Sequence, residues 1–429
     1  AVFLCASVSA QSHSPVGPDT RWTLSAVGDV IMNRRLIQFD HEGDPAFHDM
    51  ANMIRDTDAA FMNLEQSVFR LTEFEGWPAA ENGGNYEVAS PETLKDLVSM
   101  GFNLFNRANN HTTDYGVEGM QLTNRLLDEW GLIHSGSGDN LGWASRPGYL
   151  ETPKGRVALI GMASTHTPMS RAGATGPTVQ GRPGLNALRL STLHEGSPVT
   201  MDALRAAART QGSNVADDPS AAVRVFGTTV VPGGQDRSVV SLNDVDRERV
   251  LHEVRNATDQ ADYVVVNSHS HEPGNDSVLP PDWMVEFSHQ IIDAGANTMA
   301  IHGPHQLRGI EIYNGRPIFY SLGNFIFQNE TIDPMPSDQR TRYGLPLNKL
   351  ASEIYDTRFQ VDDNGNPTTG FPIGSEWYES VVAVAEFEGD EVVEIRLYPI
   401  ELGWKSPRSQ RGTPRLAPET LGRKIIENL

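Results

Sequence analysis

The chain has 429 residues and a formal charge of −21, from 34 basic and 55 acidic residues. This acidity argues against nucleic acid or an anionic membrane surface as the main partner, because both favour clustered Lys and Arg. An anionic substrate stays open, since bound divalent cations would reverse the local field. The length is enough for one large α/β domain or two smaller ones.

The first ten residues run from an apolar stretch to Val8-Ser9-Ala10, which is typical of the end of a secretory signal peptide. A frayed terminus or a first buried strand is the alternative. We therefore expect an exported, periplasmic or extracellular protein, with a linker over 11–21. Cys5 is the only cysteine and lies in this segment, so the mature chain would have neither a disulfide nor a thiol catalyst, although Cys5 itself could carry a lipid. No later apolar run approaches the roughly 18 residues that span a bilayer.

Apolar runs alternate with helical periodicities along the chain. Strands are predicted over 23–27, 59–62, 103–108, 156–161, 262–266, 298–301 and 318–322, and helices over 91–100, 116–130, 244–260 and 281–294. A late hairpin is predicted over 380–398. The Gly-, Pro- and Thr-rich stretch 166–243 is interpreted as an insertion that covers or shapes the site. This pattern predicts a layered α/β fold with a mixed sheet.

Residues of the types that bind metals follow five of these segments. They are Asp29, Glu65, Asn110-His111, the run from His269 to Glu272, and His302-Gly303-Pro304-His305. Each has an ordinary alternative when taken alone: Asp29 could cap the next helix, for example. Together they supply carboxylates, an amide and histidines without sulfur, a set that fits Zn, Mn or Fe(II). So many ligands favour two cations that share a carboxylate over one catalytic cation with an open position.

Local backbone geometry predicts which of these histidines point to the same side. His269 and His271 share one face of a strand while Glu272 does not, and the Gly303-Pro304 turn can aim its two flanking histidines at one place. Neither Gly-x-Gly-x-x-Gly after the first strand nor Gly-x4-Gly-Lys-Ser/Thr occurs in the sequence, so we expect no nucleotide cofactor.

These motifs resemble the bacterial poly-gamma-glutamate capsule biosynthesis (CapA-like) family, itself similar to calcineurin-like metallophosphoesterases. The resemblance is carried by the segments 28–32, 63–65, 108–116, 269–272 and 302–325. It implies a four-layer αββα sandwich with mixed sheets. The domain would span 22–404, followed by a C-terminal tail over 405–429.

The resemblance also implies roles for individual residues. The metal ligands would be Asp29 and His305 for the first cation, Glu65 as the bridge, and Asn110, His269 and His302 for the second. The catalytic group would be His111 as general acid with Asp114 and Asn63, and the substrate contacts would be His271, Glu272, Arg308 and Asn324. The chain departs from the phosphoesterase pattern at Ile31, where a metal-binding histidine is typical, and at Asn63-Leu64-Glu65, which replaces an aspartate motif.

Three functions are compatible with this pattern. The first is an exported metal-dependent hydrolase of a phosphoester or of an anionic envelope polymer of the poly-gamma-glutamate type, with His111 as general acid. The second is a metal-independent acid–base enzyme that acts on an amide or peptide. The third is a non-catalytic capsule-assembly subunit that binds the polymer through a basic patch made of Arg34, Arg35, Arg107 and Arg308.

Overall fold

The computed structural model describes residues 21–40, 43–216, 218–333, 335–361, 367–370 and 374–429. The expected signal-peptide segment and all but the last residue of the expected linker lie outside these ranges.

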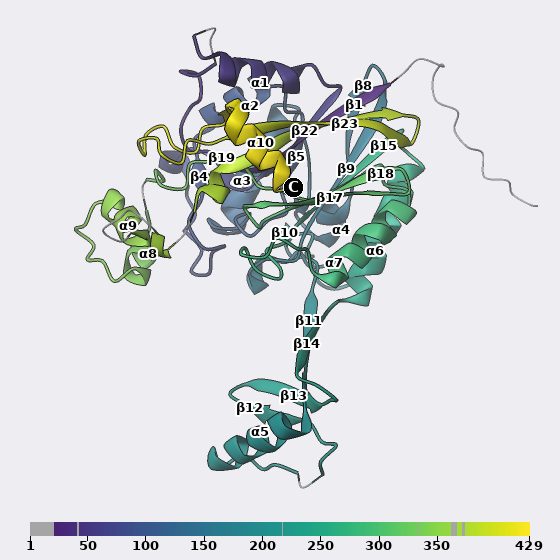
Figure 1. Ribbon diagram of the computed structural model, residues 1–429, viewed down its shortest axis with the longest axis vertical. Coiled ribbons are helices and arrows are strands. Elements are labelled where there is room, and N and C mark those ends of the chain that lie inside the picture. Colours follow the sequence, from purple (N-terminus) through teal and green to yellow (C-terminus); the bar gives the residue numbers. More distant parts are fainter. Residues whose placement is uncertain (1–20, 41–42, 217, 334, 362–366, 371–373) are drawn as a thin grey trace, which may run out of the picture.

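Two mixed β-sheets form the centre of the molecule (Figure 1). The first sheet has the strand order β24-β23-β22-β1-β2-β5-β6, with β19 also paired to β1. Its parallel strands are β1 (Trp22–Ile31), β2 (Ala59–Leu64), β5 (Leu104–Asn106), β6 (Ile133–Ser135) and β19 (Asn324–Phe327). Its antiparallel strands are β22 (Glu379–Glu388), β23 (Glu391–Glu401) and β24 (Arg415–Leu416).

The second sheet has the order β17-β18-β16-β15-β9-β8. Its parallel strands are β18 (Arg316–Leu322), β16 (Thr298–His302), β15 (Tyr263–His269) and β9 (Gly155–Ala163). The two edge strands, β17 (Leu307–Tyr313) and β8 (Gly148–Thr152), are antiparallel to their neighbours. Antiparallel edges on otherwise parallel sheets make both sheets mixed, as expected.

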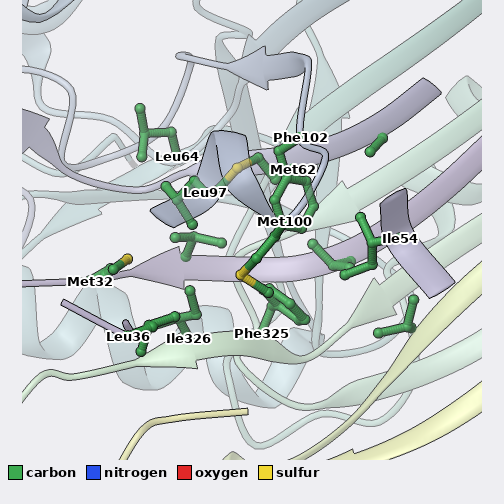
Figure 2. Close-up of a cluster of buried hydrophobic side chains, with 14 of the residues drawn as sticks. Met32, Leu36, Ile54, Met62, Leu64, Leu97, Met100, Phe102, Phe325 and Ile326 are labelled. Atoms are coloured by element: carbon green, nitrogen blue, oxygen red, sulfur yellow. The ribbon is translucent and has the colours of Figure 1, made fainter. Parts of the chain in front are cut away.

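Three apolar cores hold four layers together. One core lies between the sheets and joins side chains such as Leu24 and Phe61 of the first sheet to Leu159 and Val265 of the second. A second core lies under α1 (Pro45–Arg55), α2 (Glu92–Ser99) and α3 (Gly116–Glu129) on the outer face of the first sheet (Figure 2). A third lies under α6 (Asp244–Thr258) and α7 (Asp282–Asp293) on the second. The αββα sandwich is therefore confirmed, because each sheet buries one face against the other sheet and one against helices.

The expected insertion divides into two parts. Residues up to 188 stay near the sheets, where β10 (Gly184–Leu185) pairs with β7 (Ser137–Gly138). The rest forms an arm that extends away from the sheets (Figure 1). Two paired strands, β11 (Leu190–Gly196) and β14 (Arg237–Leu242), lead to α5 (Pro198–Thr210), β12 (Val223–Val225) and β13 (Thr228–Pro232). The outer part of the arm has its own small core around Met201 and Val223.

The last residues of the chain belong to the sandwich. The segment expected as a tail contributes β24 to the first sheet and α10 (Glu419–Glu427), whose Ile425 is buried in the core between the sheets. The remaining elements are short: β3 (Ser67–Val68), β4 (Val88–Ala89), α4 (Leu141–Ser145), α8 (Ser337–Arg342), α9 (Ala351–Arg358), β20 (Phe359–Val361) and β21 (Pro367–Gly370). Within the described ranges, no helix combines the length and apolar character needed to cross a bilayer.

Candidate metal centre

The candidate site lies where the parallel strands of both sheets end. Asp29 of β1 pairs in register with Asn63 of β2, and Asn63 pairs with Asn106 of β5. In the second sheet, His269 and His302 are register partners at the ends of β15 and β16. Parallel strands deliver their last residues to one edge of a sheet, so residues far apart in the sequence meet here.

Glu65 lies at the centre of the site and is fully buried. Neither of its carboxylate oxygens has a hydrogen-bond partner in the described part of the chain. Burial and the negative charge of Asp29 raise the pKa of Glu65 well above its ordinary value. A buried carboxylate without a donor is costly unless a cation compensates it, so this environment fits a metal ligand.

Asp29 sits inside β1 rather than after it, because the strand continues to Ile31 past a register shift between Ala26 and Asp29. Its Oδ2 accepts a 3.0 Å hydrogen bond from the backbone N–H of Gly303. The preceding Gly28 permits this arrangement, since a Cβ there would stand 2.1 Å from the carbonyl oxygen of Gly323. Asp29 is therefore held in place by backbone contacts from both sheets.

His305 is oriented toward Glu65 by Asn324. The Asn324 amide nitrogen donates to the carbonyls of His305 and Trp377, so its Oδ1 accepts from His305 Nδ1 at 2.8 Å. The other ring nitrogen, Nε2, then carries the lone pair and stands 3.9 Å from Glu65 Oε1. A ring N–H held by an amide oxygen is the usual support of a metal-binding histidine. Asn324 thus holds this histidine in place, and its expected contact with substrate stays a prediction.

His269 and His271 form a pair on one face, as the strand alternation predicts. Their Nε2 atoms are 3.1 Å apart, and His269 Nε2 is 3.5 Å from Glu65 Oε1. Burial lowers the pKa of both histidines, so both are neutral and can act as ligands. His271, expected to bind substrate, is thus placed among the metal-ligand candidates.

His302 is not among them. Its Nε2–H donates to the carbonyl of Val27 at 2.7 Å, and its Nδ1 accepts from the Asn267 amide at 2.6 Å. Both ring nitrogens are used in hydrogen bonds that point away from the Glu65 group, so His302 would have to give up one of them to act as the expected metal ligand. The sequence missed Asn267, although it lies two residues before His269 on the same strand.

Asn63, expected to be catalytic, is instead the centre of an amide network. Its Nδ2 donates to Asp29 Oδ1 at 2.8 Å and lies 3.1 Å from His269 Nδ1. Its Oδ1 accepts from the side-chain amides of Asn106 and Asn109. With every polar atom engaged, Asn63 positions the ligands.

Asn110 keeps one acceptor available. Its Nδ2 donates to the carbonyl of Gly83 at 2.9 Å, while its buried Oδ1 has no hydrogen-bond partner among the described residues. An orphaned amide oxygen fits the expected role of Asn110 as a cation ligand.

His111 and Asp114 form a buried pair beside these groups. His111 Nδ1 is 2.6 Å from Asp114 Oδ2. Burial lowers the pKa of His111, but the charge and hydrogen bond of Asp114 outweigh it, so that this pKa is raised overall. Burial, and to a smaller extent the charge of His111, lowers the pKa of His269 and of His305.

Glu87 is a further buried carboxylate that the sequence did not reveal. Its backbone N–H donates to Asp114 Oδ2 at 2.8 Å. Burial raises the pKa of Glu87 to about 7. Its sequence surroundings carry no motif that marks it.

The remaining substrate candidates have structural contacts. Arg308 is buried and donates to the carbonyls of Glu272, Gly274 and Ser277. The carboxylate of Glu272 accepts from the hydroxyls of Ser164 and Ser270. Both residues therefore fix the loop after β15.

The basic patch considered above does not form. Arg34 donates to the carbonyls of Ser409 and Arg411, and Arg35 is paired with Asp96. Arg107 is buried and donates to the carbonyls of Leu64 and Gln66. Arg107 and Arg308 are therefore occupied inside the fold, whereas Arg34 and Arg35 are partly exposed and engaged with the neighbours named above.

Two groups of ligand atoms emerge, and they share Glu65. In each group all atoms lie within 4.8 Å of one another: Asp29, Glu65 and His305 in one, and Glu65, His269 and His271 in the other. Carboxylate oxygens with neutral imidazoles form a suitable donor set for Zn, Mn or Fe(II). Together with the orphaned oxygens of Glu65 and Asn110, these residues fit divalent cations.

The fold and the site thus define an αββα protein with a carboxylate–histidine centre. The chain belongs to the family of the bacterial capsule synthesis protein PGA_cap, whose model matches residues 23–329. This confirms the family that the motifs resemble.

Relatives with curated names support the same family. The chain is 41% identical over 424 residues to "Uncharacterized protein y4sH" of Sinorhizobium fredii (strain NBRC 101917 / NGR234), covering 95% of this chain and 88% of that one. It is 25% identical to "Capsule biosynthesis protein CapA" of Bacillus anthracis, over 76% of this chain and 66% of CapA. It is 28% identical to "PGA biosynthesis protein CapA" of Bacillus subtilis (strain 168), over 71% of this chain and 62% of that one.

Two solved structures of nucleotidases resemble the chain distantly. The NAD nucleotidase NadN of Haemophilus influenzae matches 96% of this chain and 56% of its own, with a TM-score of 0.34 and 11% identity. The 5'-nucleotidase precursor of Thermus thermophilus matches 95% of this chain and 57% of its own, with a TM-score of 0.37 and 10% identity. The chain spans little more than half the length of these two structures.

Proposed function

We propose that the protein is a metal-dependent hydrolase, acting on a phosphoester or on an anionic envelope polymer of the poly-gamma-glutamate type. The observation that carries the proposal is the environment of Glu65. Its carboxylate is fully buried without a hydrogen-bond donor in the described residues, yet stands 3.5 Å from His269 and 3.9 Å from His305. A cation would satisfy a carboxylate and neutral imidazoles arranged in this way.

Asp29, Glu65, His269 and His305 would hold divalent cations, with Asn110 contributing its amide oxygen. A divalent cation supplies Lewis-acid polarisation of a phosphoryl or carbonyl oxygen and activation of water. It would also offset the protein's charge of −21 where an anionic substrate binds.

The chain's own acid would be His111. Its Nδ1 is held by Asp114, so Nε2 is the atom that can pass a proton to the leaving group. The raised pKa of His111 keeps it protonated at higher pH than an ordinary histidine, and a positioned acid typically contributes about 10² to 10⁴ in rate. Asp114 would orient the ring and stabilise its charge.

We infer the substrate class and the cellular location of this protein from its relatives in the family. Two relatives are named for capsule biosynthesis and for PGA biosynthesis, and a polymer of this kind would be met at the cell envelope. We place this chain outside the cytoplasm for the same reason, consistent with the signal-like sequence of its first ten residues.

A metal-independent acid–base enzyme is the second candidate. One observation favours it: Asn63, His269, His271 and Asn275 form a continuous chain of hydrogen-bond distances that requires no cation. This alternative does not explain why the buried Glu65 carboxylate has no hydrogen-bond partner among the described residues.

The deciding experiment measures metal content and hydrolysis on the same preparation. Purified protein is assayed for bound Mn, Fe and Zn, then tested on phosphoesters and on poly-gamma-glutamate before and after EDTA treatment. The proposal requires bound divalent metal and activity that EDTA removes and added metal restores. Activity that survives complete metal removal would establish the acid–base alternative. Polymer binding without turnover, unchanged by His111→Ala, would point to an assembly subunit instead.

A further inference from the structure

We infer that His271, and not His302, completes the second cation site, and that His302 is a structural hydrogen-bonding residue in this chain. This inference rests on the cation centre proposed above and assigns its ligands. Three observations support it: the contacts of His302, the separation of His269 and His271, and the support of the loop that carries His271.

The tautomer of His302 is fixed by its neighbours. The Asn267 amide nitrogen donates one hydrogen to the carbonyl of Ala300 at 2.8 Å and the other to His302 Nδ1 at 2.6 Å. Nε2 must then carry the ring hydrogen, which it donates to Val27 at 2.7 Å. Binding a cation through either nitrogen would break one of these buried hydrogen bonds, whereas His271 already lies with Glu65 and His269 in one group of possible ligand atoms.

His302 also serves the fold directly. Its bond to Val27 connects β16 of the second sheet to β1 of the first. The edge of its ring packs against Phe61 of β2, with ring centroids 5.6 Å apart. The residue therefore joins the two sheets just below the site.

The distance between His269 and His271 suits one shared cation. Two imidazole nitrogens that each bind a cation at about 2.1 Å stand roughly 3.0–3.4 Å apart for angles between 90° and 109°. The two Nε2 atoms are 3.1 Å apart, and Glu65 Oε1 is 3.5 Å from the first of them. His271 Nδ1 is 2.8 Å from Asn275 Oδ1, so the second nitrogen has the amide support that ligating histidines usually have.

The loop after β15 is held in this geometry. The backbone N–H of His271 donates to Thr165 Oγ1 at 2.8 Å. The Arg308 guanidinium binds the carbonyls of Glu272 and Gly274, and the Gln306 amide binds the carbonyl of Asn275. His271 is thus preorganised by its surroundings, as a ligand needs to be.

The two sites should then differ in strength. In the His269–His271 site the two Nε2 atoms are 3.1 Å apart and His269 Nε2 is 3.5 Å from Glu65 Oε1, whereas in the other site His305 Nε2 is 3.9 Å from Glu65 Oε1. Near that other site, Ile31 is buried in the core and its side chain offers no ligand atom. We expect the His269–His271 site to retain its cation longer when a chelator is added.

The test measures metal binding directly, without reference to activity. Full-length wild type, His271→Ala and His302→Ala are stripped of metal and titrated with Co²⁺, following visible absorption and the Co²⁺ retained per chain after dialysis. His194→Ala is the control, because His194 lies on the arm, where its ring bonds to Ser238. Melting temperatures of all four proteins are recorded in EDTA.

Loss of His271 should remove one equivalent of tightly bound Co²⁺ or weaken it at least about 100-fold. Loss of His302 should keep that equivalent and lower the melting temperature by about 3 °C, because two buried hydrogen bonds are lost. If His302→Ala does not fold, His302→Gln, which keeps a donor and an acceptor, gives the same comparison.

Retention of full binding by His271→Ala, or loss of an equivalent in a folded His302 variant, would overturn the inference while leaving the proposed function standing. A wild type that binds no Co²⁺, Mn²⁺ or Zn²⁺ would overturn both.

Discussion

The cation centre can be tested through stability, by replacing Glu65 with Gln. The variant keeps the shape of the side chain and removes its charge. In the metal-free protein the carboxyl group is fully buried and lacks a hydrogen-bond donor within the described residues, and this burial raises its pKa and makes its ionised form costly. Glu65→Gln should therefore stabilise the protein in EDTA, while abolishing the stabilisation that metal gives to the wild type.

The size of the effect follows from the burial. An uncompensated buried charge costs on the order of 3–5 kcal/mol. A chain of 429 residues has an unfolding entropy of about 0.9 kcal/mol per degree, so the variant should melt roughly 3–5 °C higher than the wild type in EDTA. Metal at about 100 times its dissociation constant adds about 2.7 kcal/mol to the wild type, which is roughly 3 °C.

The assay is thermal unfolding of both proteins at pH 8, in EDTA and with added Mn²⁺ or Zn²⁺. We expect the wild type to gain stability with metal and the variant to gain little. A Glu65→Gln protein that is less stable than the wild type in EDTA would show that the carboxylate has a stabilising partner, and the metal argument would fail.

Three further predictions concern residues around the centre. His111→Ala should lower the hydrolysis rate by about 10² to 10⁴-fold while leaving the bound metal unchanged by elemental analysis; equal loss of metal would make His111 a ligand instead. Glu87→Gln should change how stability depends on pH. The pKa of Glu87 is about 7 in the folded protein against an ordinary 4.5. Because ionisation of Glu87 is harder in the folded protein, the wild type loses stability increasingly from pH 4.5 to 7. Urea unfolding should therefore find the variant gaining about 2.5 kcal/mol on the wild type between pH 5 and pH 8, and no change in the difference would refute the burial argument. Gly28→Ala should destabilise by a few kcal/mol, because the added Cβ would stand 2.1 Å from the carbonyl oxygen of Gly323; unchanged stability in the same measurement would show that the strands can separate there.

Much of the architecture is visible in the sequence. The helical periods over 91–100, 116–130, 244–260 and 281–294 correspond to α2, α3, α6 and α7 with ends displaced by one or two residues. The apolar runs correspond to the central strands because those strands are buried on both faces. The first strand was the exception: β1 continues through Gly28-Asp29 to Ile31, since a register shift lets polar residues enter a buried strand.

The projection of the arm could not be foreseen. The composition of 166–243 differs from that of its surroundings, but composition does not indicate where the segment lies relative to the sheets. The long pairing of β11 with β14 carries α5, β12 and β13 away from the sheets, and that pairing is a contact between strands about forty residues apart.

The sequence by itself determined which residue types reach the edge of the sheets, because each follows or ends an apolar run whose burial is dictated by composition. It placed Asp29, Glu65, His269 and His305 in one centre, and the fold brings them together. Only the tertiary structure decided what each side chain can do there. His302 and Asn63 have the chemistry of functional residues but direct their polar atoms to other neighbours, whereas His271 Nε2 lies 3.1 Å from His269 Nε2, in the group of ligand atoms around Glu65. The physical reason is that a cation needs several ligand atoms within its reach, and the pairing of distant strands settles which side chains meet there.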